Sequence, residues 1–540
     1  MSQKINILKD RLIKSSLIFL IFSFLFDRFT STVADPDLWG YMSFGRLFWT
    51  SRYFPYLDTF SYVPTLKPWV YHEWLTGVVF YTIFENFGSV GLQLIKFGTV
   101  FLTLGFVYLT ARSKNSDPFS TALGIVATGG LLRMGYAPVR AQIFTYLFFA
   151  LSLYLLECAR KTGHRKCLLF LIPVQIVWCN LHGGFVAGLG LVFLYALGAM
   201  LSKQSSRYQW LILILSGLST AINPYGLTYW IYILRAITMS RPMITEWSSV
   251  VGILQSGEHY QTAAYFILLT IFAVIWVVRA RPDITSILIC SVTLYLGWTH
   301  IRHIPLFAIF FGCHFPSLLS IYVRNFKSNS NFEVITSRSS RIIIVLTALL
   351  IGIYYVQDAV RQGPFGLKTP DTPIARESGM YYPVGALDFI KAQHLSGKLL
   401  VHFEWGEYAI WSLSPQCSVA LDGRLETVYP QKVIDEYFDF LYGKVSWNCF
   451  LIEYAPDLIL VNRQFRSYSV LLNARDWQQI YQDRGSALFR RGVNRDIEPY
   501  ETNGVMPDPT GEYRSAVCRD APARLPEIAE ERSMLWLSAG

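Results

Sequence analysis

Long apolar stretches recur through the first two-thirds of the chain, and they constrain its fold more than any other feature. Crossing a bilayer as an α-helix takes about 17–25 mostly apolar residues. The composition agrees, because 52% of the 540 residues are hydrophobic and only 16% are charged, whereas soluble domains carry about 25% charged residues. The sequence therefore predicts a polytopic α-helical membrane protein.

Eleven segments match this pattern, although several of them are short. They are residues 13–26, 90–111, 119–132, 143–156, 168–179, 185–201, 210–222, 263–278, 284–298, 305–323 and 342–355. The segment 69–87 is ambiguous because it contains His72, Glu73 and Glu85. It is either an interfacial helix or a twelfth span.

Lysine and arginine in the short loops indicate the orientation. If segment 69–87 lies on the membrane surface, the basic loops at 112–114, 160–166, 203–207 and 279–281 share one side with the basic N-terminus. Basic residues in short loops mark the cytoplasmic side, and a twelfth span would place the loop 160–166 outside. We therefore expect about eleven spans, a cytoplasmic N-terminus and an extracytoplasmic C-terminal domain. Much of the net charge of +10 then comes from the basic loops on the cytoplasmic side. It gives no reason to invoke nucleic acid as a partner.

Three domains follow from this division. Residues 1–357 form the transmembrane domain, with a first external loop over 31–88. Residues 358–493 alternate short apolar strands with helical stretches, which is typical of an α/β domain around a mostly parallel sheet. The expected strands and helices are 398–403, 418–421 and 457–461, and 384–393 and 432–441, respectively. Residues 494–540 are rich in proline and charge, so we expect a disordered tail.

Two carboxylates, Asp35 and Asp37, follow the first span on either side of Pro36. One interpretation is a helix start, with Asp35 as the N-cap, Pro36 in the first turn and Asp37 favoured by the helix dipole. The other is chemistry, in which the pair holds a divalent cation or one Asp acts as a general base. Glu73 would add a second acid or ligand to the same loop, and a solvated pair with His72 is the alternative.

Cationic and amide side chains also gather on the expected outer face, just before spans. Arg140 and Gln142 precede one span, and Arg302 and His303 precede another. A guanidinium at that depth can bind a lipid phosphate through two hydrogen bonds; anchoring to ordinary head groups is the alternative. His182 lies before two glycines at a further span junction and is either a substrate contact or a packing and capping residue.

The order of these features resembles the glycosyltransferase C-type (GT-C) superfamily: a first span, an external loop with paired carboxylates, a second acidic site, further spans and an external C-terminal domain. The resemblance implies transfer of a sugar from a polyprenyl-phosphate-linked donor outside the cytoplasm. It maps Asp35 and Asp37 onto the first-loop acidic motif and Glu73 onto the second acidic position. It gives Arg140 and Arg302 the role of carrier-phosphate contacts.

The sequence is also similar to a set of bacterial membrane proteins of unassigned function, through six short motifs. These are Asp-Pro-Asp-Leu-Trp at 35–39, His-Glu-Trp at 72–74, His-Gly-Gly-Phe at 182–185, Asn-Pro-Tyr-Gly at 223–226, Trp-Gly-Glu-Tyr at 405–408 and Asp-Gly-Arg at 422–424. This similarity implies a bacterial inner membrane. Residues 422–424 follow an expected strand, where such sheets bind ligands, and a structural turn with an internal Asp–Arg pair is the alternative.

The leading hypothesis is an integral-membrane glycosyltransferase with catalytic Asp35, Asp37 and Glu73, and with Arg140, Gln142, His182, Arg302 and His303 binding substrate. Its partners are the polyprenyl-phosphate-linked donor, membrane lipids and a glycan, lipid or protein acceptor. Whether a divalent cation binds to Asp35 and Asp37 as a cofactor is left open by the sequence. The alternatives are a lipid-linked polymer ligase and a non-enzymatic transporter or scaffold of envelope polysaccharide assembly. A transporter would show internal repeats, and the sequence shows no convincing one.

Overall fold

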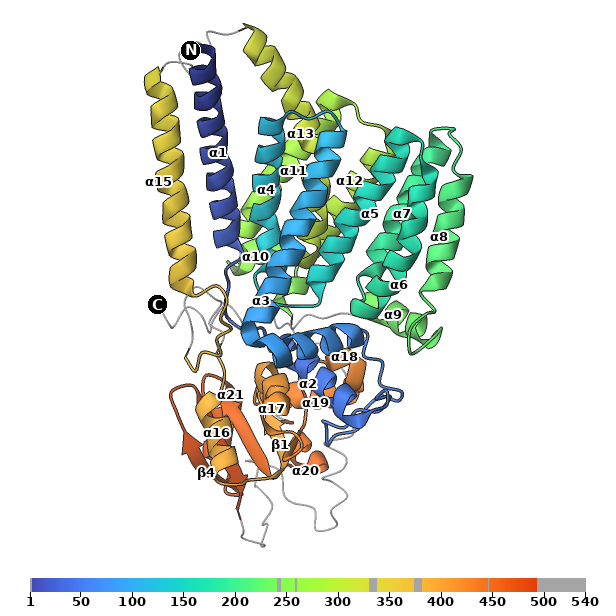
Figure 1. Cartoon of the computed structure of the whole chain (residues 1–540). Coiled ribbons are helices and arrows are strands. Elements are labelled where there is room, and N and C mark those ends of the chain that lie inside the picture. Colours follow the sequence, from blue (N-terminus) through green and yellow to red (C-terminus); the bar gives the residue numbers. More distant parts are fainter. Residues whose placement is uncertain are drawn as a thin grey trace. The chain divides into compact units, whose positions relative to one another are not determined.

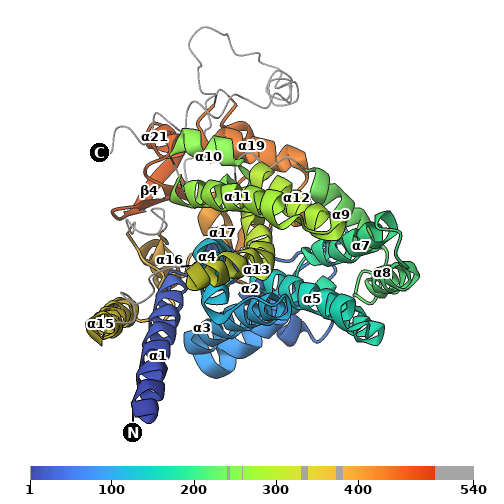
Figure 2. The ribbon, with the colours of Figure 1, turned by 90° about the horizontal axis from the view of Figure 1, so that it is seen from above.

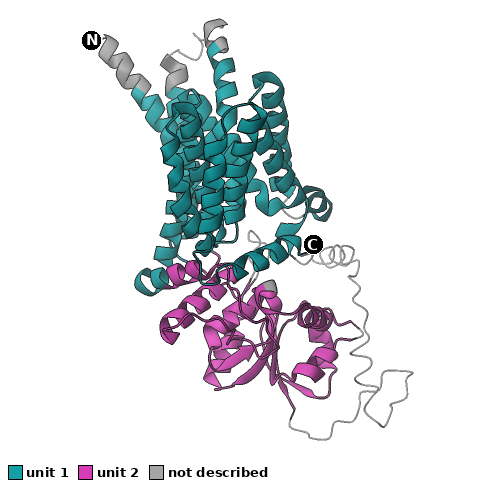
Figure 3. Cartoon of the chain, turned by 90° about the vertical axis from the view of Figure 1, so that its right-hand side faces the viewer, with its two compact units in different colours: residues 1–32, 82–367 teal, residues 33–81, 368–540 magenta. Residues whose placement is uncertain are grey.

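The computed structural model describes residues 2–239, 244–257, 260–329, 338–372, 381–444 and 446–492. It divides into two compact units, coloured separately in Figure 3. Unit 1 combines residues up to 32 with 82–367, and unit 2 combines 33–81 with the chain from 368 onward. Most of the first external loop thus groups with the C-terminal part, and not with the transmembrane helices as expected. The expected tail, 494–540, lies outside the described residues.

Unit 1 is helical, and each of the eleven expected spans falls on a helix (Figure 1). These helices are α1 (Ser2–Arg28), α3 (Trp74–Ser113), α4 (Pro118–Tyr136), α5 (Gln142–Thr162), α6 (Leu171–Leu181), α7 (Phe185–Leu201), α8 (Arg207–Ser219), α11 (Tyr260–Ala280), α12 (Ile284–Thr299), α13 (Ile304–Asn329) and α15 (Arg338–Gln362). Within the described ranges, five helices are long and apolar enough to cross a membrane, namely α3, α5, α11, α13 and α15, and α7 and α12 are shorter apolar helices. The chain is a multi-pass α-helical membrane protein, but the count of eleven spans is not confirmed.

The ambiguous segment 69–87 leads into α3, which is kinked. Gly88 has φ 59° and ψ −155°, a left-handed backbone that glycine adopts without steric cost. The kink separates Trp74–Phe87 from the apolar residues that follow. Whether this first part lies on the membrane surface stays a prediction.

Close helix packing organises unit 1. Helices α1 and α15 pack together, as do α4 and α13 (Figure 2). The α4–α13 contact is tight because Gly312 faces Thr128, whose hydroxyl donates to the Ala308 carbonyl oxygen at 3.1 Å. Small residues and hydroxyls at such contacts are typical of helices packed in lipid.

Unit 2 contains a five-stranded sheet in the order β2-β1-β3-β5-β4. The strands are β1 (Gly397–Val401), β2 (Cys417–Val419), β3 (Leu458–Asn462), β4 (Trp477–Gln482) and β5 (Ser486–Arg491), and the helices of this part are α16 (Val384–Ala392), α17 (Gly406–Leu413), α18 (Leu425–Val428), α19 (Gln431–Leu441), α20 (Cys449–Tyr454) and α21 (Arg466–Leu472). The expected strands and helices are all present, and the C-terminal α/β domain is confirmed. The sheet is mixed and not mostly parallel, because β5 pairs antiparallel with both β3 and β4.

The first external loop is built into this sheet domain. Segment 60–62 lies beside β2, where Val419 donates its N–H to Phe60 and accepts one from Tyr62. Val33 forms a parallel bridge with Lys368. The loop also contributes α2 (Pro36–Ser51), which packs on α17. These backbone hydrogen bonds explain why two segments about 300 residues apart form one unit.

Candidate functional site

The start of α2 separates the roles of the two loop aspartates. Asp35 has extended backbone angles, and its carboxylate accepts a hydrogen bond from the Asp37 N–H at 3.1 Å. Pro36 occupies the first helical position, so the helix-cap interpretation of Asp35 is confirmed. Asp35 is buried, at 3% exposure, whereas Asp37 is half-buried. Of the two carboxylates, Asp37 is the one better placed to meet a substrate.

Glu407 of α17 lies between two glycines beside Asp37. Its Oε2 accepts the Gly40 N–H of α2 at 2.9 Å. A Cβ placed on Gly423 would lie 2.9 Å from Glu407 Oε1 and 3.4 Å from Asp37 Oδ1. The two acids therefore meet at the Gly423 backbone, and glycine at positions 40 and 423 makes room for the Glu407 carboxyl.

The surroundings of Glu407 disfavour its charge. Burial, followed by the negative charges of Asp37 and Asp422, raises the pKa of Glu407 well above its usual value, while Arg424 and the Gly40 N–H act in the opposite direction. The side chain is 4% exposed. Burial together with a neighbouring like charge keeps a carboxyl group protonated.

Tyr71 connects this pair to Glu73. Burial raises the pKa of the Tyr71 phenol well above 10, and the charges of Glu73, Glu407 and Asp37 raise it further. The charges of these three acids therefore act on one buried phenol. Glu73 itself is half-buried, and its carboxylate lies 3.6 Å from His72 Nε2. We call Asp37, Glu73, Tyr71 and Glu407 the acid cluster.

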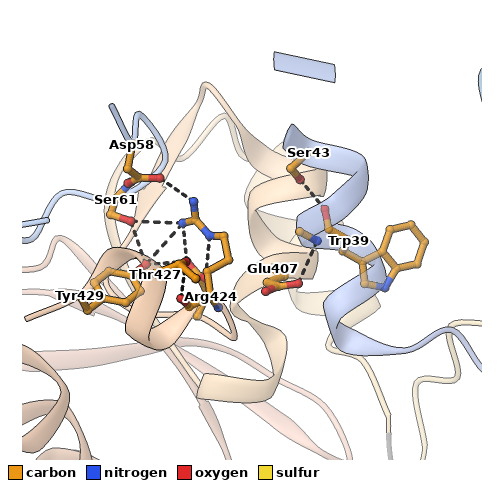
Figure 4. A network of polar contacts seen from close by, with 10 residues as sticks. Trp39, Ser43, Asp58, Ser61, Glu407, Arg424, Thr427 and Tyr429 are labelled. Atoms are coloured by element: carbon orange, nitrogen blue, oxygen red, sulfur yellow. Dashed lines mark hydrogen bonds and ion pairs between the residues drawn. The ribbon is translucent and has the colours of Figure 1, made fainter. Parts of the chain in front are cut away.

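Next to the acid cluster, Arg424 forms a buried ion network, shown in Figure 4. Its Nε and Nη2 donate to the two carboxylate oxygens of Asp422 at 2.8 and 2.7 Å, and Nη1 donates to Asp58 at 2.5 Å. The Tyr429 hydroxyl also donates to Asp422 at 2.5 Å. Burial alone would lower the pKa of Arg424, but Asp422 and Asp58 raise it well above its usual value. The structural-turn interpretation of Asp422-Gly423-Arg424 is thus supported, and the turn also ties the first loop to the sheet domain.

In unit 1, the two arginines expected to bind phosphate converge on one short segment. Arg140 forms an ion pair with Glu246, and the Arg302 guanidinium lies 4.5 Å from the centre of the Trp247 ring. Glu246 and Trp247 belong to the 3-10 helix η2 (Thr245–Trp247). The structure therefore brings Arg140 and Arg302 together; we call these four residues the arginine cluster.

The other expected binding residues of unit 1 are placed differently. His303 packs edge-on against Trp247, with 6.0 Å between ring centres, so it joins the arginine cluster. Gln142 is the first residue of α5 and is half-buried. His182 Nδ1 accepts the Gly184 N–H at 2.9 Å and lies 2.7 Å from the Thr145 hydroxyl. These hydrogen bonds support a capping and packing role for His182 at the α6–α7 junction.

Three residues that make polar contacts in the structure were not among the expected site residues. Glu407 lies in the motif at 405–408, and Asp58 lies in the first external loop. Lys96 lies within an expected span, is fully buried, and donates to the carbonyl oxygens of Ser31 and Ala137 at 2.8 and 3.1 Å. An ionisable residue inside a span is a functional candidate by default, and that signal was present in the sequence.

The metal hypothesis gains no ligand set here. Across the part of the chain that the structure describes, no group of three or more His, Cys, Asp or Glu side chains is arranged to hold a metal ion. A cation on Asp35 and Asp37 stays a prediction.

Comparisons with known proteins return distant structural matches. No family model and no curated protein matches the sequence. The chain is similar to the crystal structure of ArnT from Cupriavidus metallidurans bound to undecaprenyl phosphate, with 12% identity and a TM-score of 0.47 over 89% of this chain and 98% of that chain. For the apo state of ArnT the values are 14%, 0.45, 91% and 98%. Likeness at this level concerns the course of the chain and carries no conclusion about activity.

Proposed function

We propose that this protein is an integral-membrane glycosyltransferase that moves a sugar from a polyprenyl-phosphate-linked donor to an acceptor outside the cytoplasm. The observation that carries the proposal is Asp37, a half-buried carboxylate on the first turn of α2, held by the Asp35 cap and flanked by Glu407. A membrane protein with a half-buried carboxylate next to other acids has the group that base-assisted transfer requires.

The reaction that we propose is an inverting displacement. An acceptor hydroxyl attacks the anomeric carbon of the sugar, and the bond from that carbon to the carrier phosphate oxygen breaks. The electron pair of this bond stays on the carrier phosphate, and the acceptor proton passes to Asp37. Glu73 contributes negative charge next to Asp37 and binds the acceptor.

The carrier phosphate is assigned to the arginine cluster. Arg140 and Arg302 are cations held at the ends of apolar helices by Glu246 and Trp247. A guanidinium binds a phosphate through two parallel hydrogen bonds. The base role of Asp37 is preferred to a metal role because, across the residues that the structure describes, no group of three or more His, Cys, Asp or Glu side chains is arranged to hold a metal ion. Whether the reaction requires a divalent cation is tested by adding a chelator to the assay described below.

The test measures release of the carrier. Purified protein in lipid vesicles receives undecaprenyl-phosphate-linked sugars and an extract of envelope acceptors, and undecaprenyl phosphate is quantified by mass spectrometry. Asp37→Asn should reduce its release by about 10²-fold or more, as expected for loss of a general base. Asp435→Asn, on the exposed face of α19, is the matched control and should not change the rate.

Several outcomes would contradict the proposal. Full activity of Asp37→Asn would remove the base assignment, provided that the variant keeps the wild-type melting temperature. Release only from a polymer-loaded carrier would favour the ligase, and no release from any donor would favour a transporter or scaffold.

A further inference from the structure

One oxygen of the Glu407 carboxyl accepts a backbone hydrogen bond, and the other lies near Gly423 and Asp37. Oε2 accepts the Gly40 N–H at 2.9 Å, from the helix that begins at the Asp35 cap. Oε1 and Asp37 Oδ1 lie 2.9 and 3.4 Å from the position that a Cβ on Gly423 would occupy, so the two carboxyl groups are neighbours there. Because the Gly40 N–H donates to Oε2 and so favours an unprotonated oxygen there, we expect a proton on this carboxyl to reside on Oε1, the oxygen that lies near Gly423 with Asp37 Oδ1.

Of the charged groups that act on Glu407, the acids disfavour its ionised form and Arg424 favours it. The negative charges of Asp37, on α2, and of Asp422, on the turn after β2, both disfavour an ionised Glu407. The cation Arg424 is already bound by Asp422 and Asp58, so most of its charge is neutralised locally. A second negative charge at position 407 would therefore be buried without a cation of its own, which is costly.

We propose that Glu407 is a positioning residue, which in its protonated form donates a hydrogen bond to Asp37 and keeps that carboxylate ionised and in place. This inference rests on the proposed base role of Asp37. A neutral carboxyl that donates to a carboxylate stabilises the anion, so the partner stays deprotonated and able to accept a proton. The motif at 405–408 then acts on the reaction through Asp37, without touching the substrate.

The first experiment reads the protonation state directly and needs no substrate. Infrared difference spectra of wild-type and Glu407→Gln protein in lipid at pH 7 should contain the carbonyl stretch of a protonated carboxyl group, present only in the wild type. In Asp37→Asn this band should shift to higher frequency, because an amide accepts a weaker hydrogen bond than a carboxylate. Absence of the band, or a band that Asp37→Asn does not move, would overturn the proposal even if the protein proves to be a transferase.

The second experiment uses the carrier-release assay. Gln at position 407 can accept from Gly40 with its oxygen and donate to Asp37 with its amide, whereas Met has a similar volume and no hydrogen-bonding groups. Glu407→Gln should keep activity within about 5-fold of the wild type, and Glu407→Met should lose about 10²-fold, as in the loss of an oriented general base. Equal activity of both variants would show that only packing matters at this position. If no donor is turned over, the transferase fails while the infrared result still decides the state of Glu407.

Stability against pH supplies a third readout. The folded-state pKa of Glu407 is raised, so its contribution to stability is present below the unfolded pKa of about 4.3 and is lost as pH rises toward the folded value. Glu407→Gln does not titrate. The melting temperature of this variant relative to the wild type should therefore increase between about pH 5 and pH 8. A constant difference over this range would mean that Glu407 is already ionised in the fold.

Discussion

The acid cluster of unit 2 and the arginine cluster of unit 1 are built in opposite ways. The acids come from distant segments of the sequence, and Glu407 together with the neighbouring Arg424 is almost fully buried. In the arginine cluster, Arg140 and Glu246 keep 16% and 29% of their side chains exposed. Burial shifts pKa values and makes the loss of one charge expensive. Partial exposure leaves a cation able to exchange its partner for a ligand. One cluster is thus suited to proton chemistry and the other to binding.

The largest effect on stability is expected at Arg424. Arg424→Ala would leave Asp58 and Asp422 buried without their cation, at a cost of about 3–5 kcal/mol. Thermal unfolding of the full chain in detergent measures this loss. Arg424→Lys keeps the charge but not the two-pronged hydrogen bonds, so it should be destabilised less than Arg424→Ala. If Arg424→Ala melted like the wild type, the contrast between a buried and an exposed cluster would fail.

A smaller effect, on binding and not on stability, is expected in the arginine cluster. Arg302→Gln should weaken binding of undecaprenyl phosphate by about 10-fold or more, because a hydrogen bond to a charged group contributes about 1.5–3 kcal/mol. Binding to protein in nanodiscs is the measurement, and Arg140→Gln should behave similarly. Arg279→Gln, in the last turn of α11, is the matched control. Equal binding by Arg302→Gln and this control would leave the cluster with an anchoring role only.

The smallest effect is expected at the helix cap. Asp35→Ala should destabilise unit 2 by about 1 kcal/mol, the usual cost of a lost N-cap. Asp35→Ser restores a capping oxygen and should recover most of the loss. Both variants should retain carrier release within a few-fold, in contrast to Asp37→Asn. Loss of activity in Asp35→Ser at unchanged stability would give Asp35 a chemical role and remove the division between the two aspartates.

Much of the architecture could be read from the sequence, because hydrophobic periodicity and length are local signals. Each expected span coincides with a helix, and the Asp35 cap was one of two stated interpretations. The hairpin of β4 and β5 was missed, because Trp477–Gln482 is partly exposed along its length and lacks the alternation that marks a half-buried strand. The number of spans and the positions of the termini stay predictions.

The sequence by itself determined that this chain is a membrane protein with an α/β domain after its helices, and it identified Asp37, Arg140 and Arg302 as candidates. Only the tertiary structure decided that Asp37 meets Glu407, roughly 370 residues later, whereas the Asp35 cap is a local feature that the sequence already offered as one of two interpretations. Hydropathy, caps and turns depend on neighbours within a few residues. The charge state of a carboxyl depends on burial and on groups that folding brings within a few ångströms, and no local pattern contains that information.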